Sequence, residues 1–231
     1  MFPIKDPESY GGFPIVNLVL IVTNIYVFFR QLASPDPELF INTYALIPSN
    51  IDFARIETLL PFITSLFLHA GFLHILSNMW FLWVFGDNVE AKMGHIPYLA
   101  FYIFCGIAAS LAQYLVIPGS ILPMIGASGA IAGVLGAYLR YFPRHSINTL
   151  VPVLGFPIII SVPAGFMLVY WFIIQAFSGA ASIVTSTAMF GGVAYFAHAG
   201  GFVSGLLFSP FFENKLRLYL LDHIGNTMSI Y

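Results

Sequence analysis

Apolar stretches of 14 to 22 residues recur along the whole chain, and they restrict its fold more than any other feature. A transmembrane helix needs about 20 mainly apolar residues, since the hydrocarbon core is about 30 Å thick. We expect six spans, at residues 13–29, 70–85, 97–116, 128–141, 163–177 and 191–212. Only 8% of the 231 residues are charged, against about 25% in soluble domains. The predicted fold is therefore an all-α membrane protein, a six-helix bundle that forms one domain over residues 1–231.

The lysines and arginines are distributed unevenly between the expected loops. Cytoplasmic loops of membrane proteins carry an excess of these residues. With the N-terminus inside, the cytoplasmic set is Lys5, Lys92, Arg140, Arg144, Lys215 and Arg217, and the outer set is Arg30 and Arg55. We therefore expect both termini in the cytoplasm, with an N-terminal segment at residues 1–12 and a tail at residues 213–231.

The composition also argues against several other functions. A net charge of −2 gives no sign of a nucleic-acid partner. Cys105 is the only cysteine, so neither an internal disulfide nor a cysteine metal cluster is expected, and we expect no metal and no cofactor. Residues 1–12 resemble neither a transit peptide nor a cleavable signal, which favours a prokaryotic plasma or inner membrane. The oligomeric state is left open.

Several connecting segments have distinct characters. Residues 30–69 are expected to form a long loop, and its later part, residues 51–68, mixes apolar and charged side chains, as expected for short amphipathic helices at the membrane interface. Residues 117–127 contain Pro118, Gly119 and Pro123 and no charge, which indicates a loop, and residues 150–160 read as extended. The fourth span, at residues 128–141, is too short to cross the bilayer alone, so the loop at residues 117–127 must dip into the membrane. Irregular backbone at that depth requires burial in protein or contact with water, which predicts a water-filled cavity there.

Ser128 opens the fourth span and His198 lies in the sixth. Ser128 lies 12 residues, about 18 Å of helix, before Arg140, and His198 lies 15 residues, about 22 Å, before Glu213. At matching depth they would form a serine nucleophile and its general base. No acidic residue lies nearby in a span, so a dyad is expected rather than a triad. The alternatives are a serine bonded to its own helix and a structural histidine bonded to a carbonyl.

His74 and Asn78 are four residues apart and therefore share one face of the second span. Both side chains can donate hydrogen bonds, as the oxyanion hole of a hydrolase requires. The alternative is that this pair holds two helices together. For His69, at the boundary of the preceding loop, we favour a structural role.

Small residues recur at intervals of four in the fourth and sixth spans. The two series are Gly129, Gly133 and Ala137, and Ala197, Gly201 and Gly205. Small residues at this spacing let membrane helices approach closely. The pattern predicts that these two spans pack together, which would bring Ser128 to His198.

Four stretches, taken together, resemble the rhomboid family of intramembrane serine proteases. They are His74-x-x-x-Asn78, Gly126-Ala127-Ser128-Gly129, Ala197-His198 and Gly201-x-x-x-Gly205. The resemblance implies a rhomboid-like bundle with Ser128 as nucleophile and His198 as base. It implies an oxyanion hole made by His74, Asn78 and the Ser128 backbone N–H, and a structural role for Glu90. Two features depart from the family pattern: a Trp-Arg pair in the first outer loop is absent, and Ala132 stands where some members have an aromatic residue.

The resemblance further implies cleavage of single-pass transmembrane protein substrates near the outer face of the bilayer. The substrate would enter beside the fifth span, and residues 178–190 would cover the site as a displaceable cap. The alternative is a catalytically inactive relative that acts in membrane binding or quality control. A proton- or ion-coupled transporter is disfavoured, because no Asp, Glu, Lys or Arg is expected at membrane depth, Arg140 lying at the cytoplasmic end of its span. A zinc protease is disfavoured because no H-E-x-x-H sequence occurs.

Overall fold

Helices make up most of the computed structural model, which describes residues 2–8, 11–153, 156–184 and 194–213. The helices in these ranges are α1 (Ile15–Leu32), α2 (Pro37–Tyr44), α3 (Pro61–Thr64), α4 (Phe72–Met93), α5 (His95–Val116), α6 (Ser128–Tyr141), α7 (Ala164–Val184) and α8 (Tyr195–Phe208). The strands are β1 (Phe2–Lys5), β2 (Ser146–Val153) and β3 (Phe156–Pro163). Short 3₁₀ turns occur at Pro48–Asn50, Ile56–Thr58, Ser65–Phe67 and Ser209–Phe212.

Among the described residues, three helices are long and apolar enough to cross a membrane alone. They are α1, α5 and the Ala164–Ile183 part of α7. Ile56–Phe67 and Phe72–Met93 form a pair bent by 81° that would count as a fourth span. The helices α6 and α8 have 14 residues each, about 21 Å of helix. The chain is a mostly helical, multi-pass membrane protein; six crossings and cytoplasmic termini remain predictions.

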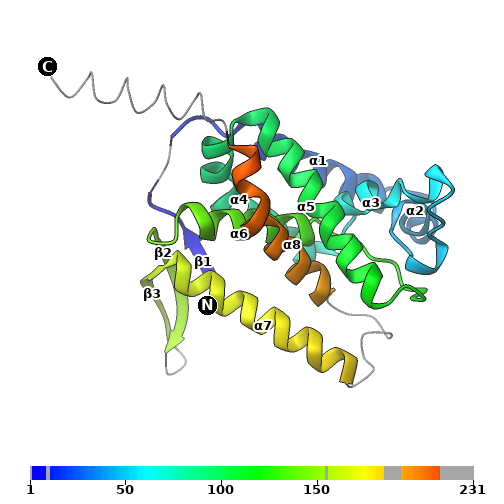
Figure 1. Ribbon diagram of the computed structural model, residues 1–231. Helices are drawn as coiled ribbons and strands as arrows, with labels where there is room; N and C mark the ends of the chain where they lie inside the picture. Colours follow the sequence, from blue (N-terminus) through cyan, green and yellow to red (C-terminus); the bar gives the residue numbers. More distant parts are fainter. Residues whose placement is uncertain (1, 9–10, 154–155, 185–193, 214–231) are drawn as a thin grey trace, which may run out of the picture.

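The expectation of an all-α fold is wrong, because the chain also forms a three-stranded antiparallel sheet in the order β1-β2-β3. The hairpin of β2 and β3 pairs Ser146 with Pro163 at one end and Val153 with Phe156 at the other. Both strands are rich in isoleucine and valine, which favour strands. Figure 1 shows the sheet beside the start of α7.

The first strand comes from the segment that we expected to be a simple cytoplasmic extension. β1 pairs with β2, with Phe2 opposite Leu150. It is also tied to α4, because the Trp80 indole N–H donates to the Pro3 carbonyl at 2.7 Å and the Phe2 ring stacks on Trp80. Pairing over such a sequence distance leaves no local pattern in four residues, so the sequence could not reveal it.

Two predicted boundaries also need correction. The second span was expected to end near residue 85, but α4 continues through Asp87 and Glu90 to Met93. The cap was expected to begin at residue 178, but α7 is helical to Val184; the remainder of that cap, residues 185–190, lies outside the described residues. The sixth span was expected at residues 191–212; residues 191–193 lie outside the described residues, and the end in the 3₁₀ turn Ser209–Phe212 agrees with the prediction.

The hydrogen bonds made by Glu90 explain why this acidic residue is tolerated inside α4. Its carboxylate accepts hydrogen bonds from the backbone N–H groups of Val16 at 2.9 Å and Asn17 at 2.7 Å, in the first turn of α1. Its Oε1 also lies 2.5 Å from His95 Nδ1. A carboxylate is favourable at a helix N-terminus, where unpaired N–H groups and the helix dipole meet it. Glu90 therefore fixes α1 against α4 and the start of α5, which is a structural role.

The backbones of α6 and α8 touch at their glycines, and α6 also packs against α4 and α5. A Cβ atom added to Gly205 would lie 2.7 Å from Gly133 Cα, and one added to Gly201 would lie 3.0 Å from the Gly129 carbonyl carbon. Gly136, which the spacing of four did not include, is equally close to α8, since its Cβ would lie 2.8 Å from the Leu206 nitrogen. These contacts bring the first turns of α6 and α8 together.

We expect Gly201→Ala to destabilise the protein by about 1–3 kcal/mol, a typical cost of overpacking a well-packed contact. The added methyl group would overlap the Gly129 carbonyl and push α8 away from α6. The matched control is Gly119→Ala, because a Cβ at Gly119 has no atom within 4 Å. Thermal unfolding of both variants in detergent measures the effect, and an equal midpoint for the two would contradict the packing role of Gly201.

Candidate active site

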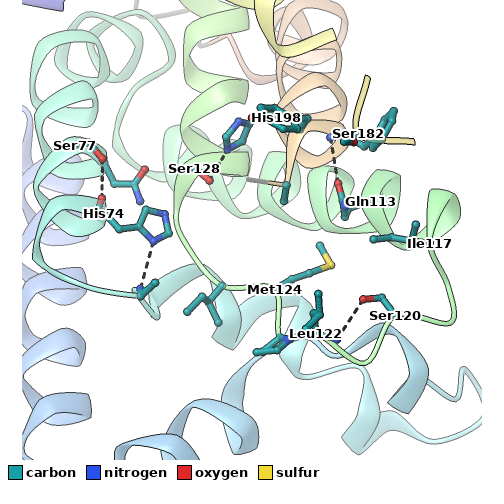
Figure 2. A pocket seen from close by; sticks show the side chains of 17 residues that line it. His74, Ser77, Gln113, Ile117, Ser120, Leu122, Met124, Ser128, Ser182 and His198 are labelled. Atoms are coloured by element: carbon teal, nitrogen blue, oxygen red, sulfur yellow. Dashed lines mark hydrogen bonds between the residues drawn. The ribbon is translucent and has the colours of Figure 1, made fainter. Parts of the chain in front are cut away.

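A cavity of about 760 Å³ lies where α4, the loop before α6, and the first turns of α6 and α8 meet. Figure 2 shows the side chains that line it. Its polar lining comprises His74, Ser77, Asn78, Gln113, Ser128 and His198, with two further serines on the loop before α6 and on α7. The structure thus brings the four predicted site side chains into one cavity.

Ser128 is held at the first position of α6 by a loop that is bonded to the rest of the protein. Leu46 and Met124 exchange backbone hydrogen bonds of 3.1 and 2.8 Å, and the Gly126 N–H donates to the Ser65 carbonyl at 3.0 Å. Irregular backbone inside a membrane protein needs such internal partners. The loop therefore presents the serine rigidly to the cavity.

Gly126 has a structural role in this loop rather than at a helix contact. Its φ of +124° lies in a region that side chains other than hydrogen disfavour. A Cβ atom there would also lie 2.9 Å from His74 Nε2 and 3.7 Å from Ser128 Oγ. Glycine at this position lets the His74 ring lie close to Ser128.

His198 is positioned by the start of α8. The Gln113 side-chain oxygen, from α5, accepts hydrogen bonds from the backbone N–H groups of Phe196 at 3.1 Å and Ala197 at 3.2 Å. These N–H groups belong to the first turn of a helix and have no partner within it. Gln113 thus anchors the turn that carries His198, a role that the sequence interpretation missed.

Ser128 Oγ and His198 Nε2 are 2.8 Å apart, although the residues are 70 positions apart in the sequence (Figure 2). On its other side, His198 Nδ1 lies 2.8 Å from Gln175 Oε1 of α7. The Trp171 ring packs on the imidazole with centroids 5.9 Å apart. The imidazole is therefore held by two residues of α7.

Gln175 and Trp171 were not among the predicted site residues. One signal could have found the first of them: Gln175 is the only amide or charged side chain in α7. Polar side chains inside membrane spans commonly form hydrogen bonds with neighbouring helices. Trp171 had no comparable signal, because aromatic residues are frequent in this chain, at 17%.

His74 and Asn78 present hydrogen-bond donors to the cavity. The Ala70 backbone N–H donates to His74 Nδ1 at 3.3 Å, which places the ring proton on Nε2, the nitrogen close to Gly126. Asn78 is 6% exposed, and its buried side-chain nitrogen has no hydrogen-bond partner among the described residues. Asn78 lines the cavity together with His74, so this donor lies at the cavity wall.

His69 fits the structural role that we favoured for it. Its backbone N–H and carbonyl both bond the side chain of Gln31 in α1, at 3.3 and 2.8 Å. Its ring packs against Phe28 and His74. It therefore joins α1 to the turn before α4 and supports the His74 ring from behind.

Within the described ranges, no group of three or more histidine, cysteine or acidic side chains could hold a metal ion. Cys105 is buried in α5 and packs against Gly133. A Cβ atom added to Gly133 would overlap the Cys105 side chain. The polar residues that line the cavity are serines, one tyrosine, two histidines and two amides.

Comparison with known proteins identifies the relatives of this chain. The profile of the Rhomboid domain matches residues 57–214, more than half of the chain. "Rhomboid protein 1, mitochondrial" of Saccharomyces cerevisiae is 31% identical over 225 residues, which cover 94% of this chain and 59% of that protein. "Putative rhomboid protease YdcA" of Bacillus subtilis is 31% identical over 130 residues, 55% of this chain and 62% of that protein.

A plant protein shows a shorter match. "Rhomboid-like protein 11, chloroplastic" of Arabidopsis thaliana is 40% identical over 73 residues, 32% of this chain and 26% of that protein. The matched regions thus span between 26% and 62% of the lengths of these three relatives. The profile match contains the whole cavity-forming region from α4 to α8, and this chain belongs to the rhomboid family.

Proposed function

We propose that the chain is an intramembrane serine endopeptidase that cleaves transmembrane protein substrates with a Ser128–His198 dyad. The observation that carries the proposal is the 2.8 Å contact between Ser128 Oγ and His198 Nε2 in a cavity of a multi-pass membrane protein. A serine hydroxyl is a weak nucleophile until an adjacent base accepts its proton. The name of one relative, "Putative rhomboid protease YdcA", agrees with this proposal.

The reaction would proceed by acyl transfer in two halves. Ser128 Oγ attacks the scissile carbonyl carbon while His198 Nε2 takes the hydroxyl proton, and the resulting imidazolium then protonates the leaving amine. The acyl group remains on Ser128 as an ester. A water molecule from the cavity, deprotonated by His198, hydrolyses the ester and restores the free serine.

The oxyanion of the tetrahedral intermediate would be bound by three donors. They are His74 Nε2–H, the Asn78 side-chain N–H and the backbone N–H of Ser128. The last belongs to the first turn of α6, where backbone N–H groups lack helical partners and the helix dipole favours negative charge. Fixed donors aimed at developing charge provide a large part of the rate enhancement in enzymes of this type.

Substrates of this site would be single-pass transmembrane proteins that approach beside α7. That helix is the least buried of the three single-helix candidate spans, at 17% against 33% for α1 and 39% for α5, and it runs along the edge of the bundle (Figure 1). With both termini in the cytoplasm, the cavity would lie toward the outer face of a prokaryotic plasma or inner membrane. Lipid would then surround the protein, and water would reach the cavity from outside.

A fluorophosphonate probe tests the proposal directly, because it labels only an activated serine. We expect the folded protein in detergent to react, with the mass of the phosphonate mapping to the peptide that contains Ser128. Heat-denatured protein provides the control and should not react. Absence of labelling on the folded protein would favour the alternative, an inactive rhomboid-like protein that acts in membrane binding or quality control.

A further inference from the structure

We propose that Gln175 is a positioning residue that orients His198 and holds it in the tautomer required by Ser128. This inference rests on the proposed protease function and extends the dyad to a third group. The sequence offered no acidic residue for this role, and an amide takes its place.

The hydrogen bonds on the two sides of the imidazole are consistent with one arrangement of protons. Gln175 Oε1 lies 2.8 Å from His198 Nδ1, and an amide oxygen can only accept a hydrogen bond. The proton of the neutral ring therefore sits on Nδ1. The lone pair of Nε2 then faces Ser128 Oγ at 2.8 Å, where it can receive the hydroxyl proton. With the opposite tautomer, Nε2 would be a donor and could not act as a base.

Gln175 lies behind the histidine rather than in the substrate cavity. Among the described residues, the cavity lining includes His198 and Ser128 but not Gln175. Trp171, four residues earlier and so on the same face of α7, packs on the same imidazole. The neighbouring Phe172 stacks on Phe202 of α8, with centroids 4.9 Å apart. These contacts hold α7 against α8 and keep the Gln175 amide next to the His198 imidazole.

The hydrogen bond from His198 to Gln175 should be stronger in the transition state than in the ground state. When His198 accepts the Ser128 proton, the imidazole becomes a cation and its Nδ1–H becomes a stronger donor. Hydrogen bonds that involve a charged partner are about twice as strong as neutral ones. Because Gln175 does not reach the cavity, its loss should lower kcat and leave KM nearly unchanged.

The test compares Gln175→Leu with Gln175→Glu, and uses Ile174→Leu as the matched control on the same helix. Leucine removes the acceptor, whereas glutamate keeps a side-chain oxygen at the same distance whether or not it is ionised. Ile174 is 41% exposed on the surface of α7. We expect Gln175→Leu to lower kcat about tenfold, the upper range for a neutral hydrogen bond, and to slow fluorophosphonate labelling equally. Gln175→Glu should restore both rates, and Ile174→Leu should match the unaltered protein.

Each outcome decides between the possible explanations. If the unaltered protein does not react with the probe, the proposed function itself fails, whatever Gln175 does. If the unaltered protein reacts and Gln175→Leu has the same kcat, the positioning role is overturned. If Gln175→Leu loses activity only in proportion to a lower folded fraction, and Gln175→Glu does not restore kcat per folded molecule, the residue is structural and the inference is also overturned.

Discussion

Replacing Ser128 by alanine is expected to lower the turnover of a transmembrane substrate by roughly 10⁴–10⁶-fold, the range seen when a catalytic nucleophile is removed from a serine protease. The hydroxyl is the atom that would form the acyl-enzyme, and alanine cannot replace it. The side chain is small and half-buried at the start of α6, so the fold should persist. Cleavage of a reconstituted substrate, measured together with the thermal unfolding midpoint, checks both parts.

Two comparisons make this experiment specific. Ser182→Ala removes another hydroxyl that lines the same cavity and should leave turnover unchanged. His198→Ala should lose as much activity as Ser128→Ala, and the double variant should lose no more than either single variant, because groups that act as one unit are not additive. Turnover by Ser128→Ala close to that of the unaltered protein would remove the protease hypothesis.

Asn78→Ala and His74→Ala are each expected to lower kcat by roughly 10²–10³-fold, as the loss of one donor from an oxyanion hole does. The oxyanion exists only in the transition state, so KM should change little. Asn78 offers the sharper case, because its side-chain nitrogen is buried without a partner among the described residues. The remaining donors should keep the activity of both variants above that of Ser128→Ala.

A purely structural role for these two residues predicts a different result. In that case Asn78→Ala would lower the melting temperature and leave kcat per folded molecule nearly intact. The matched control is Ser77→Ala, on the same turn of α4, whose hydroxyl bonds only the His74 carbonyl among the described residues. Measuring kcat and thermal unfolding on the same purified samples separates the two roles, and a normal kcat would exclude Asn78 from the mechanism.

Much of this molecule could be anticipated from residue types and their spacing. The scarcity of charge predicted a membrane protein, and that prediction is confirmed. The glycine series in the fourth and sixth spans predicted a close contact, and the structure places Gly201 against Gly129 and Gly205 against Gly133. The candidate dyad was also expected, and the structure brings Ser128 Oγ within 2.8 Å of His198 Nε2; its catalytic role remains a prediction.

Other features of the fold could not be predicted from any local sequence pattern. The strand β1 is a short segment that pairs with residues about 145 positions later. The ends of α4 and α7 were placed too early, because Asp87 and Glu90 suggested a helix end and the small residues after Phe177 suggested a loop. In the folded chain, Glu90 is satisfied by the first turn of α1. A charge that finds such a partner does not end a helix.

Residue types and their spacing were enough to predict the membrane environment of the chain, the candidate chemical groups and the helices that must approach closely. These properties depend on transfer free energy, side-chain chemistry and side-chain size, which each residue carries with it. The folded arrangement was needed to see which nitrogen of His198 faces Ser128. It was also needed to see that Gln175, 23 positions earlier in the sequence, lies next to the other nitrogen. Those contacts depend on how α7 and α8 are rotated and packed against each other, and that rotation arises from the summed packing of the whole bundle rather than from any stretch of sequence.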